Sequence, residues 1–102
     1  MQTKIKQKNH GEYAIEGELN MQTVPAVSKQ LPEFINQVEG KDFTLDLASV
    51  SRSDSAGVAL MVELMQLTTA ANISLHLSNL PQQMKDIADV SGLLDILPIS
   101  QN

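Results

Sequence analysis

Two kinds of hydrophobic spacing alternate along this chain, and their order constrains the fold more than any other feature. In several short segments apolar and polar residues alternate, which is typical of strands with one buried face. Longer segments in which apolar residues recur every three or four positions follow these, as expected for helices that cover a sheet. The expected strands are residues 3–8, 13–19, 43–47 and 73–77. With 102 residues, the chain has room for one domain, residues 1–102.

Three helices are expected between and after these strands. The first follows Thr23 as a possible cap and ends near Gly40, the second covers about residues 56–71, and the third begins after Ser78 or Asn79. Strands that alternate with helices on short connections predict an α/β fold with some parallel strand pairing. We therefore expect a small mixed β-sheet of about four to five strands, with the helices packed mainly on one face and the apolar tail 93–98 against the sheet.

Composition excludes several classes of function. Seven Lys and Arg residues against twelve Asp and Glu residues give a net charge of −5, which argues against binding to nucleic-acid phosphates. Aromatic residues make up only 3%, too few for platforms that stack bases. The chain has no Cys, and its two His residues, His10 and His76, are far apart in sequence. We therefore expect no metal site, no cofactor and no nucleic-acid partner.

The sequence contains no segment typical of membrane insertion or secretion. Its longest apolar run, residues 56–62, is much shorter than the roughly 20 residues that span a bilayer. The first eight residues lack the apolar stretch of a secretory signal. We expect a cytoplasmic protein that inserts into no membrane and reaches one only through a partner.

Known catalytic patterns are also missing. There is no phosphate-binding glycine loop, no dinucleotide fingerprint and no metalloprotease motif. Asp46 and Asp54 form a conceivable acid–base pair, but Asp54 precedes a helix, where a carboxylate is favoured as a cap. Ser55, His76 and Asp46 provide the residue types of a triad, but nothing in their spacing brings them together. We expect no catalytic residues and no enzyme activity.

The second expected helix is unusually apolar, with Glu63 as its only charged residue. Its apolar arc covers roughly 200°, about twice what a helix lying on one sheet requires. Deep burial explains this as well as an exposed flank of Val58, Val62 and Met65 that binds a partner. Methionine suits such an adaptable contact surface. The sequence leaves both explanations open.

Ser55 lies at the start of this helix and also has two interpretations. Its hydroxyl is a plausible cap for the first backbone N–H groups. Alternatively, it lies exposed beside a partner surface, where phosphorylation would add about −1.5 to −2 charges and act as a switch. Gly57 favours the second interpretation, because a residue without a side chain allows close approach of another backbone.

Three stretches of the chain resemble the STAS domain, which sulfate transporters and anti-sigma-factor antagonists share. They are residues 17–20 (GELN), 45–50 (LDLASV) and 54–58 (DSAGV). The resemblance extends over nearly the whole chain and implies a STAS-type fold. Within the family, residues 51–60 (SRSDSAGVAL) are most similar to the MlaB type, the STAS subunit of the Mla phospholipid ABC transporter of Gram-negative envelopes.

This resemblance implies a non-enzymatic subunit that binds and stabilises or activates the cytoplasmic ATPase subunit, which is MlaF-like. In that role the chain lies at the inner membrane in a complex with permease and lipid-binding subunits and maintains outer-membrane lipid asymmetry. We expect the contact surface to consist of Arg52, Ser53, Asp54, Ser55, Ala56, Gly57, Val58, Val62, Met65, Met84 and Lys85.

The alternative is an anti-sigma-factor antagonist, in which the residue matching Ser55 is the phosphoacceptor. Ser55 favours this class, since MlaB-type proteins usually have Thr there. Arg52 and Ala56 favour the MlaB type, because antagonists commonly have an apolar residue near the former and a second Ser at the latter. Asn20 departs from the Asp common in the family. We take the transporter subunit as the main interpretation and the phosphorylated antagonist as the alternative.

Overall fold

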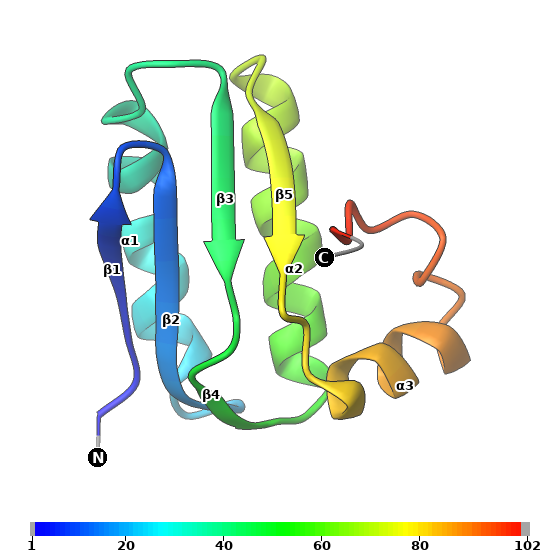
Figure 1. Cartoon of the computed structure of the whole chain (residues 1–102). Helices are drawn as coiled ribbons and strands as arrows, with labels where there is room; N and C mark the ends of the chain where they lie inside the picture. The colour runs from blue at the N-terminus through cyan, green and yellow to red at the C-terminus, as the bar shows by residue number, and fades with distance from the viewer. Residues whose placement is uncertain (1, 101–102) are drawn as a thin grey trace.

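The computed structural model describes residues 2–100, and within them a five-stranded mixed sheet is covered by helices (Figure 1). The strands are β1 (Lys4–Asn9), β2 (Glu12–Leu19), β3 (Asp42–Asp46), β4 (Val50–Ser53) and β5 (Ser74–Ser78). The helices are α1 (Val24–Asn36), α2 (Ser55–Ala70) and α3 (Gln82–Val90). The predicted α/β fold with a small mixed sheet is confirmed.

The strands follow the order β1-β2-β3-β5, and β4 pairs with the far end of β2. β1 and β2 form an antiparallel hairpin, whereas the pairs β2–β3, β2–β4 and β3–β5 are parallel. β2 changes partner from β3 to β4 near Gly17, where the register of the β2–β4 pair is irregular. Gly17 has a φ of +109°, which few other residues adopt. This glycine therefore lets one strand serve two parallel partners.

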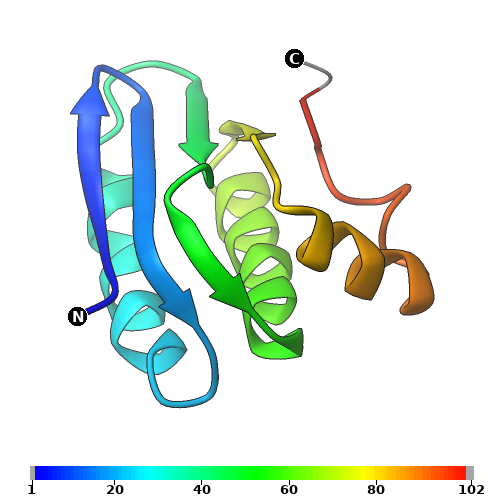
Figure 2. The same cartoon turned by 60° about the horizontal axis from the view of Figure 1, so that its bottom comes forward.

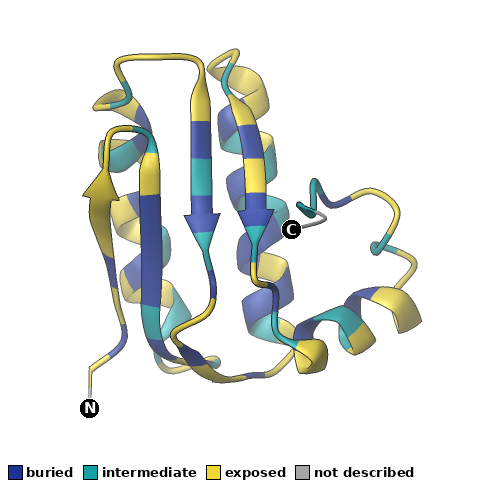
Figure 3. Ribbon diagram, in the orientation of Figure 1, coloured by how far each residue is buried: buried dark blue, intermediate teal, exposed yellow. Residues whose placement is uncertain are grey.

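The two long helices lie behind the sheet in Figure 1, so that α1 covers β1 and β2 and α2 covers β3 and β5. α3 lies beside the lower end of α2. The apolar residues of the strands point toward the helices and the polar ones point away, which gives the striped pattern of burial in Figure 3. The prediction that the helices pack mainly on one face is confirmed.

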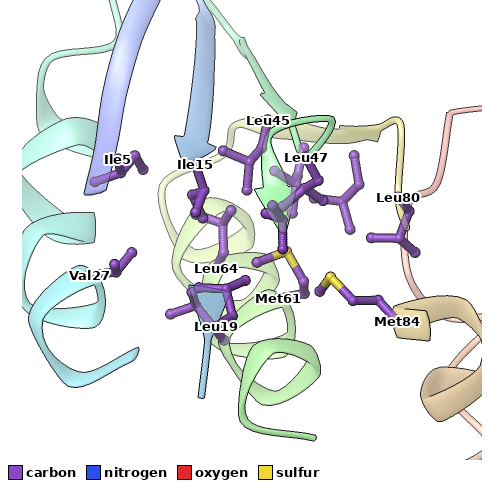
Figure 4. Close-up of a cluster of buried hydrophobic side chains, with 14 of the residues drawn as sticks. Ile5, Ile15, Leu19, Val27, Leu45, Leu47, Met61, Leu64, Leu80 and Met84 are labelled. Carbon is purple, nitrogen blue, oxygen red and sulfur yellow. The ribbon is translucent and has the colours of Figure 1, made fainter. Parts of the chain in front are cut away.

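The core fills the layer between the sheet and the helices (Figure 4). Leu19 and Leu45 from the sheet meet Met61 and Leu64 of α2 there, and Met84 of α3 closes its edge. Burying side chains of this size contributes about 1.5–3 kcal/mol each. At the other end of the core, the rings of Tyr13 and Phe43 are stacked with centroids 4.1 Å apart.

α2 is apolar around most of its circumference because neighbours cover most of it. It contacts α1 on one side, α3 on the other, and both β4 and β5 of the sheet. Val58 is therefore buried, together with Leu60, Met61 and Leu64. Burial explains most of this helix's composition, and the expected exposure of Val58 is wrong.

Several local predictions were incomplete. Residues 50–53 were expected to be loop but form β4. α3 begins after Pro81 without a side-chain cap, rather than after Ser78 or Asn79. Thr23 precedes α1 but makes no capping hydrogen bond. The tail does pack against the sheet: Leu97 is buried and Ile99 pairs with Leu77 of β5, as expected.

The opposite face of the sheet, which we call the open face, carries the polar residues of β1, β2, β3 and β5. Lys6 lies 2.6 Å from Glu16, and His76 lies 3.0 Å from Asp42. Asp46 accepts hydrogen bonds from Lys8 at 2.8 Å, from the Asn79 side chain at 3.0 Å and from the backbone N–H of Ala48 at 2.9 Å. These contacts lower the pKa of Asp46 to about 2, and the hydrogen bond from Lys8 has the largest effect. Asp46 thus links β1, β3 and the end of β5.

We expect the Asp46→Asn variant to be less stable than the wild type at neutral pH and to lose this difference in acid. Because the pKa of Asp46 is lower in the folded chain, its contribution is complete above about pH 5 and is lost as the pH falls through 4 toward 2. The effect at pH 7 should be below about 1 kcal/mol, because the ion pair is largely exposed and screened by solvent. Urea unfolding at pH 7, 5 and 3 measures it. The exposed Asp95→Asn serves as the control. An equal loss of stability in this control, or a difference between Asp46→Asn and the wild type that does not change with pH, would contradict the role of Asp46.

Gly57 packs where no larger residue fits. A Cβ atom there would overlap Ser53 Oγ and lie 3.1 Å from Leu19 Cβ. We expect Gly57→Val to lower the free energy of unfolding by about 1–3 kcal/mol, as overpacked core positions do. Gly40 has no atom within 4 Å of such a Cβ, so Gly40→Val should change stability by less than about 0.5 kcal/mol. Chemical denaturation compares the two variants, and equal stabilities would contradict the close packing.

Candidate functional site

The start of α2 is fixed by its cap and by the end of β2. The Asp54 side chain accepts a hydrogen bond of 2.8 Å from the backbone N–H of Ala56, and the Asp54 backbone N–H donates to the Leu19 carbonyl at 3.1 Å. Asp54 is therefore the N-cap, as the sequence suggested, and Ser55 is the first helical residue. Asp46 and Asp54 have separate partners and form no acid–base pair.

Ser55 is exposed, and its hydroxyl forms no hydrogen bond with any residue in the range 2–100. Since Asp54 takes the capping role, the explanation of Ser55 as a cap is wrong. What remains is a free hydroxyl at the positive end of a helix of 16 residues. Such a hydroxyl is accessible to a modifying enzyme or to a partner's backbone.

Four of the residues expected to contact a partner are buried. Gly57 and Val58 are buried in the first turn of α2, where Gly57 packs against Leu19 at the end of β2. Met84 of α3 is buried in the core, and Ser53 is buried at the end of β4. Ser53 donates from its hydroxyl to the Asp54 carbonyl at 3.0 Å and from its backbone N–H to the Gln83 side chain at 2.9 Å. The expectation that these four residues face a partner is wrong, because the packing of β2, β4, α2 and α3 against one another buries them.

Gly57 in particular has an internal role. Its missing side chain allows α2 to approach Leu19 and Ser53 of the same chain. The close approach inferred from the sequence is therefore real, but the neighbour is β2 and β4 rather than a partner's backbone.

The other expected contact residues retain accessible surface. Arg52, Asp54 and Ser55 are exposed, and Ala56, Val62 and Met65 of α2 and Lys85 of α3 are half-buried. Val62 follows Ser55 by two helical turns and lies on the same side of α2. Beside it, Glu63 accepts hydrogen bonds of 2.7 and 2.8 Å from the Ser28 hydroxyl of α1. The accessible part of the predicted surface is thus a narrow strip that begins at Ser55.

The structure adds residues that the sequence did not single out. The end of β2, the following turn, β4 and α3 together line a shallow hollow of about 260 Å³ beside the N-cap. Glu18 and Asn20 from the β2 side and Gln83 from α3 line it with Arg52 and Asp54. Gln83 had no sequence signal, because its position depends on how α3 packs. Asn20 was noticed only as a departure from the family pattern.

The three residues of the conceivable triad lie apart in the structure. His76 contacts Asp42 on the open face, whereas Ser55 lies at the end of α2, so the conceivable triad is not assembled. Within residues 2–100, no three His, Asp or Glu side chains cluster closely enough to hold a metal ion. None of the helices in that range is both long and apolar enough to span a bilayer.

Comparison with known proteins gives a consistent result. Residues 2–102 match the family described as STAS domain. The chain is 31% identical over 97 residues to the anti-sigma-B factor antagonist of Bacillus subtilis, covering 94% of this chain and 87% of that protein. It is 27% identical over 90 residues to the anti-sigma-B factor antagonist of Staphylococcus epidermidis, covering 88% and 82%.

Solved structures with the same fold include the anti-sigma factor antagonist SpoIIAA in its unphosphorylated form. It superposes with a TM-score of 0.70 at 20% identity over 98% of this chain and 89% of that one. The phosphorylated form of SpoIIAA, a Bacillus cell fate determinant, gives a TM-score of 0.66 at 21% identity, over 98% and 92%. The mixed sheet, the capped start of α2 and the family match over residues 2–102 lead to one conclusion: this chain belongs to the STAS-domain family.

Proposed function

We propose that this chain is an anti-sigma-factor antagonist that binds a kinase-type anti-sigma factor and is switched by phosphorylation of Ser55. The relatives named above carry the antagonist's name and match nearly the full length of this chain. These relatives therefore favour the phosphorylated antagonist, which the sequence suggested as the alternative, over the transporter subunit.

The observation that carries the proposal is the free Ser55 hydroxyl. It is exposed at the first position of α2, while Asp54 performs the capping that would otherwise occupy it. Replacement of the hydroxyl hydrogen by the γ-phosphoryl group of ATP, with release of ADP, would therefore break no hydrogen bond among residues 2–100. The backbone N–H groups and the dipole at a helix N-terminus favour a phosphate, so α2 would remain intact.

The same phosphate would change the partner surface. It would add about −1.5 to −2 charges next to the Asp54 carboxylate and two turns from the half-buried Val62. A partner that packs an apolar or acidic surface against this strip would then face repulsion and the cost of desolvating a phosphate. We infer that the unmodified chain binds and the phosphorylated chain is released.

The transporter interpretation has less support. None of the relatives named above is a transport subunit; each is an anti-sigma-B factor antagonist. Ser55 also favours the antagonists over the Thr usual in MlaB-type proteins. Arg52 and Ala56 remain the features that point the other way. Membrane association through an ATPase is therefore not part of the proposal.

We expect the purified kinase-type anti-sigma factor of the same organism, incubated with ATP and this chain, to add one phosphate to Ser55. Intact-mass spectrometry followed by peptide mapping identifies the position. Ser55→Ala should bind the same kinase but gain no phosphate. Ser55→Glu should bind at least about tenfold more weakly, because a fixed charge imitates part of the phosphate.

The matched control is Ser91→Glu. It places the same charge on another exposed serine, which lies at the C-terminal end of α3 and outside the expected contact surface. It should bind and be phosphorylated like the wild type. No binding of the wild type to the kinase, or phosphate on another residue, contradicts the proposal. Binding to a purified MlaF-like ATPase in place of the kinase would favour the transporter interpretation.

A further inference from the structure

Met21 is a large apolar side chain that the fold leaves in water. It is 77% exposed, although most of its neighbours in the turn between β2 and α1 are polar. Single exposed apolar residues are common on protein surfaces and need no explanation by themselves. Its surroundings distinguish Met21 from such cases.

The turn that carries Met21 is held rigidly. The Asn20 side-chain oxygen accepts hydrogen bonds from the backbone N–H groups of Gln22 at 2.9 Å and Thr23 at 3.1 Å. The Thr23 hydroxyl accepts from the Asn20 backbone N–H at 3.0 Å and donates to the Glu18 carbonyl at 2.7 Å. Met21 lies inside this closed network, so its backbone is ordered before any partner binds. A preorganised anchor loses less conformational entropy on binding than a mobile one.

The turn is also fixed relative to Ser55. β2 ends at Leu19, whose carbonyl accepts from the backbone N–H of Asp54, and Asn20 and Asp54 line the same hollow. Figure 2 shows the turn after β2 and the start of α2 at the same end of the molecule. Met21 directly follows Asn20 in the chain and Ser55 directly follows Asp54, so each residue adjoins the lining of this hollow.

Charged groups surround this surface without neutralising one another. Arg52, Glu18 and Asp54 line the hollow, and none of them forms an ion pair with a residue in the range 2–100. An exposed apolar side chain on an ordered turn, with charged residues beside it, matches the pattern of an interface that has an apolar centre and a polar rim. Two carboxylates and a net charge of −5 make an anionic lipid surface a poor alternative.

We propose that Met21 is the apolar anchor of the partner-binding surface that contains Ser55, and that it inserts into an apolar pocket on a folded anti-sigma factor. This inference rests on the proposed function and deepens it. Phosphorylation of Ser55 regulates binding, whereas the apolar contact of Met21 contributes to the affinity and is not itself modified.

The test measures the dissociation constant of the purified kinase-type anti-sigma factor for the full chain, without ATP so that Ser55 stays unmodified. Met21→Ser should raise the dissociation constant by about tenfold or more, as hot-spot truncations do. Met21→Leu should restore most of the affinity, because it keeps the apolar volume. The control is Val90→Ser, which removes a second exposed apolar side chain, 90% exposed at the C-terminal end of α3, and should change the dissociation constant less than twofold.

Thermal unfolding should show equal stability for all these variants, since both side chains are largely in water. If the wild type does not bind the anti-sigma factor, the proposed function fails and this inference fails with it. If the wild type binds and Met21→Ser binds equally well, only the anchor is wrong. Binding of the wild type, but not of Met21→Ser, to phosphatidylglycerol vesicles together with unchanged anti-sigma affinity would assign Met21 to a membrane and overturn the proposal. Self-association that Met21→Ser abolishes, with the same unchanged affinity, would assign it to a second copy and also overturn it.

Discussion

The structure depends most on the contact between the first turn of α2 and the end of β2. Gly57 allows α2 to approach Leu19 and Ser53 more closely than any side chain would permit. The backbone of Asp54 is hydrogen-bonded to Leu19, while its side chain caps the helix. One short segment thus joins the sheet, β4 and the longest helix, and it fixes the direction in which that helix begins.

The candidate site is a consequence of this contact. Because Asp54 supplies the cap, the neighbouring Ser55 is left with an exposed hydroxyl that the fold does not use. Because β2 ends at the same place, the turn with Met21 and the start of α2 lie at the same end of the molecule, where Asn20 and Asp54 line one shallow hollow. A site built on backbone hydrogen bonds and a close helix–sheet contact needs little rearrangement on binding, and a charge added at Ser55 acts on a surface of fixed shape.

Sequence reasoning predicted most of the fold because burial in this chain follows simple periods. The alternating residues of β2, β3 and β5 and the apolar spacing of α1 and α2 lie where they were expected. β4 was missed, since only Val50 of its four residues is apolar and its pairing depends on where β2 passes. Asn79 looked like a helix cap because Asn favours caps, but its side chain is bound to Asp46 instead.

The candidate site was predictable in part. Ser55 and Asp54 could be placed at a helix start from their order in the sequence, and Arg52 is exposed beside them. Ser53, Gly57, Val58 and Met84 were assigned to the partner surface instead of the interior, because their burial depends on how β2, β4, α2 and α3 pack against one another. Gln83 and Met21 join the surface for the same reason, through the packing of α3 and the turn after β2.

The most direct test of the central claim, that the surface around Ser55 binds an anti-sigma factor, is an NMR titration of the isotopically labelled chain with the purified anti-sigma factor. We predict the largest changes in amide chemical shift at residues 20–23, at 52–56 and at Val62. Changes confined to the open face, at residues such as Lys6, Thr44 and His76, would show that the partner binds elsewhere and would contradict the claim.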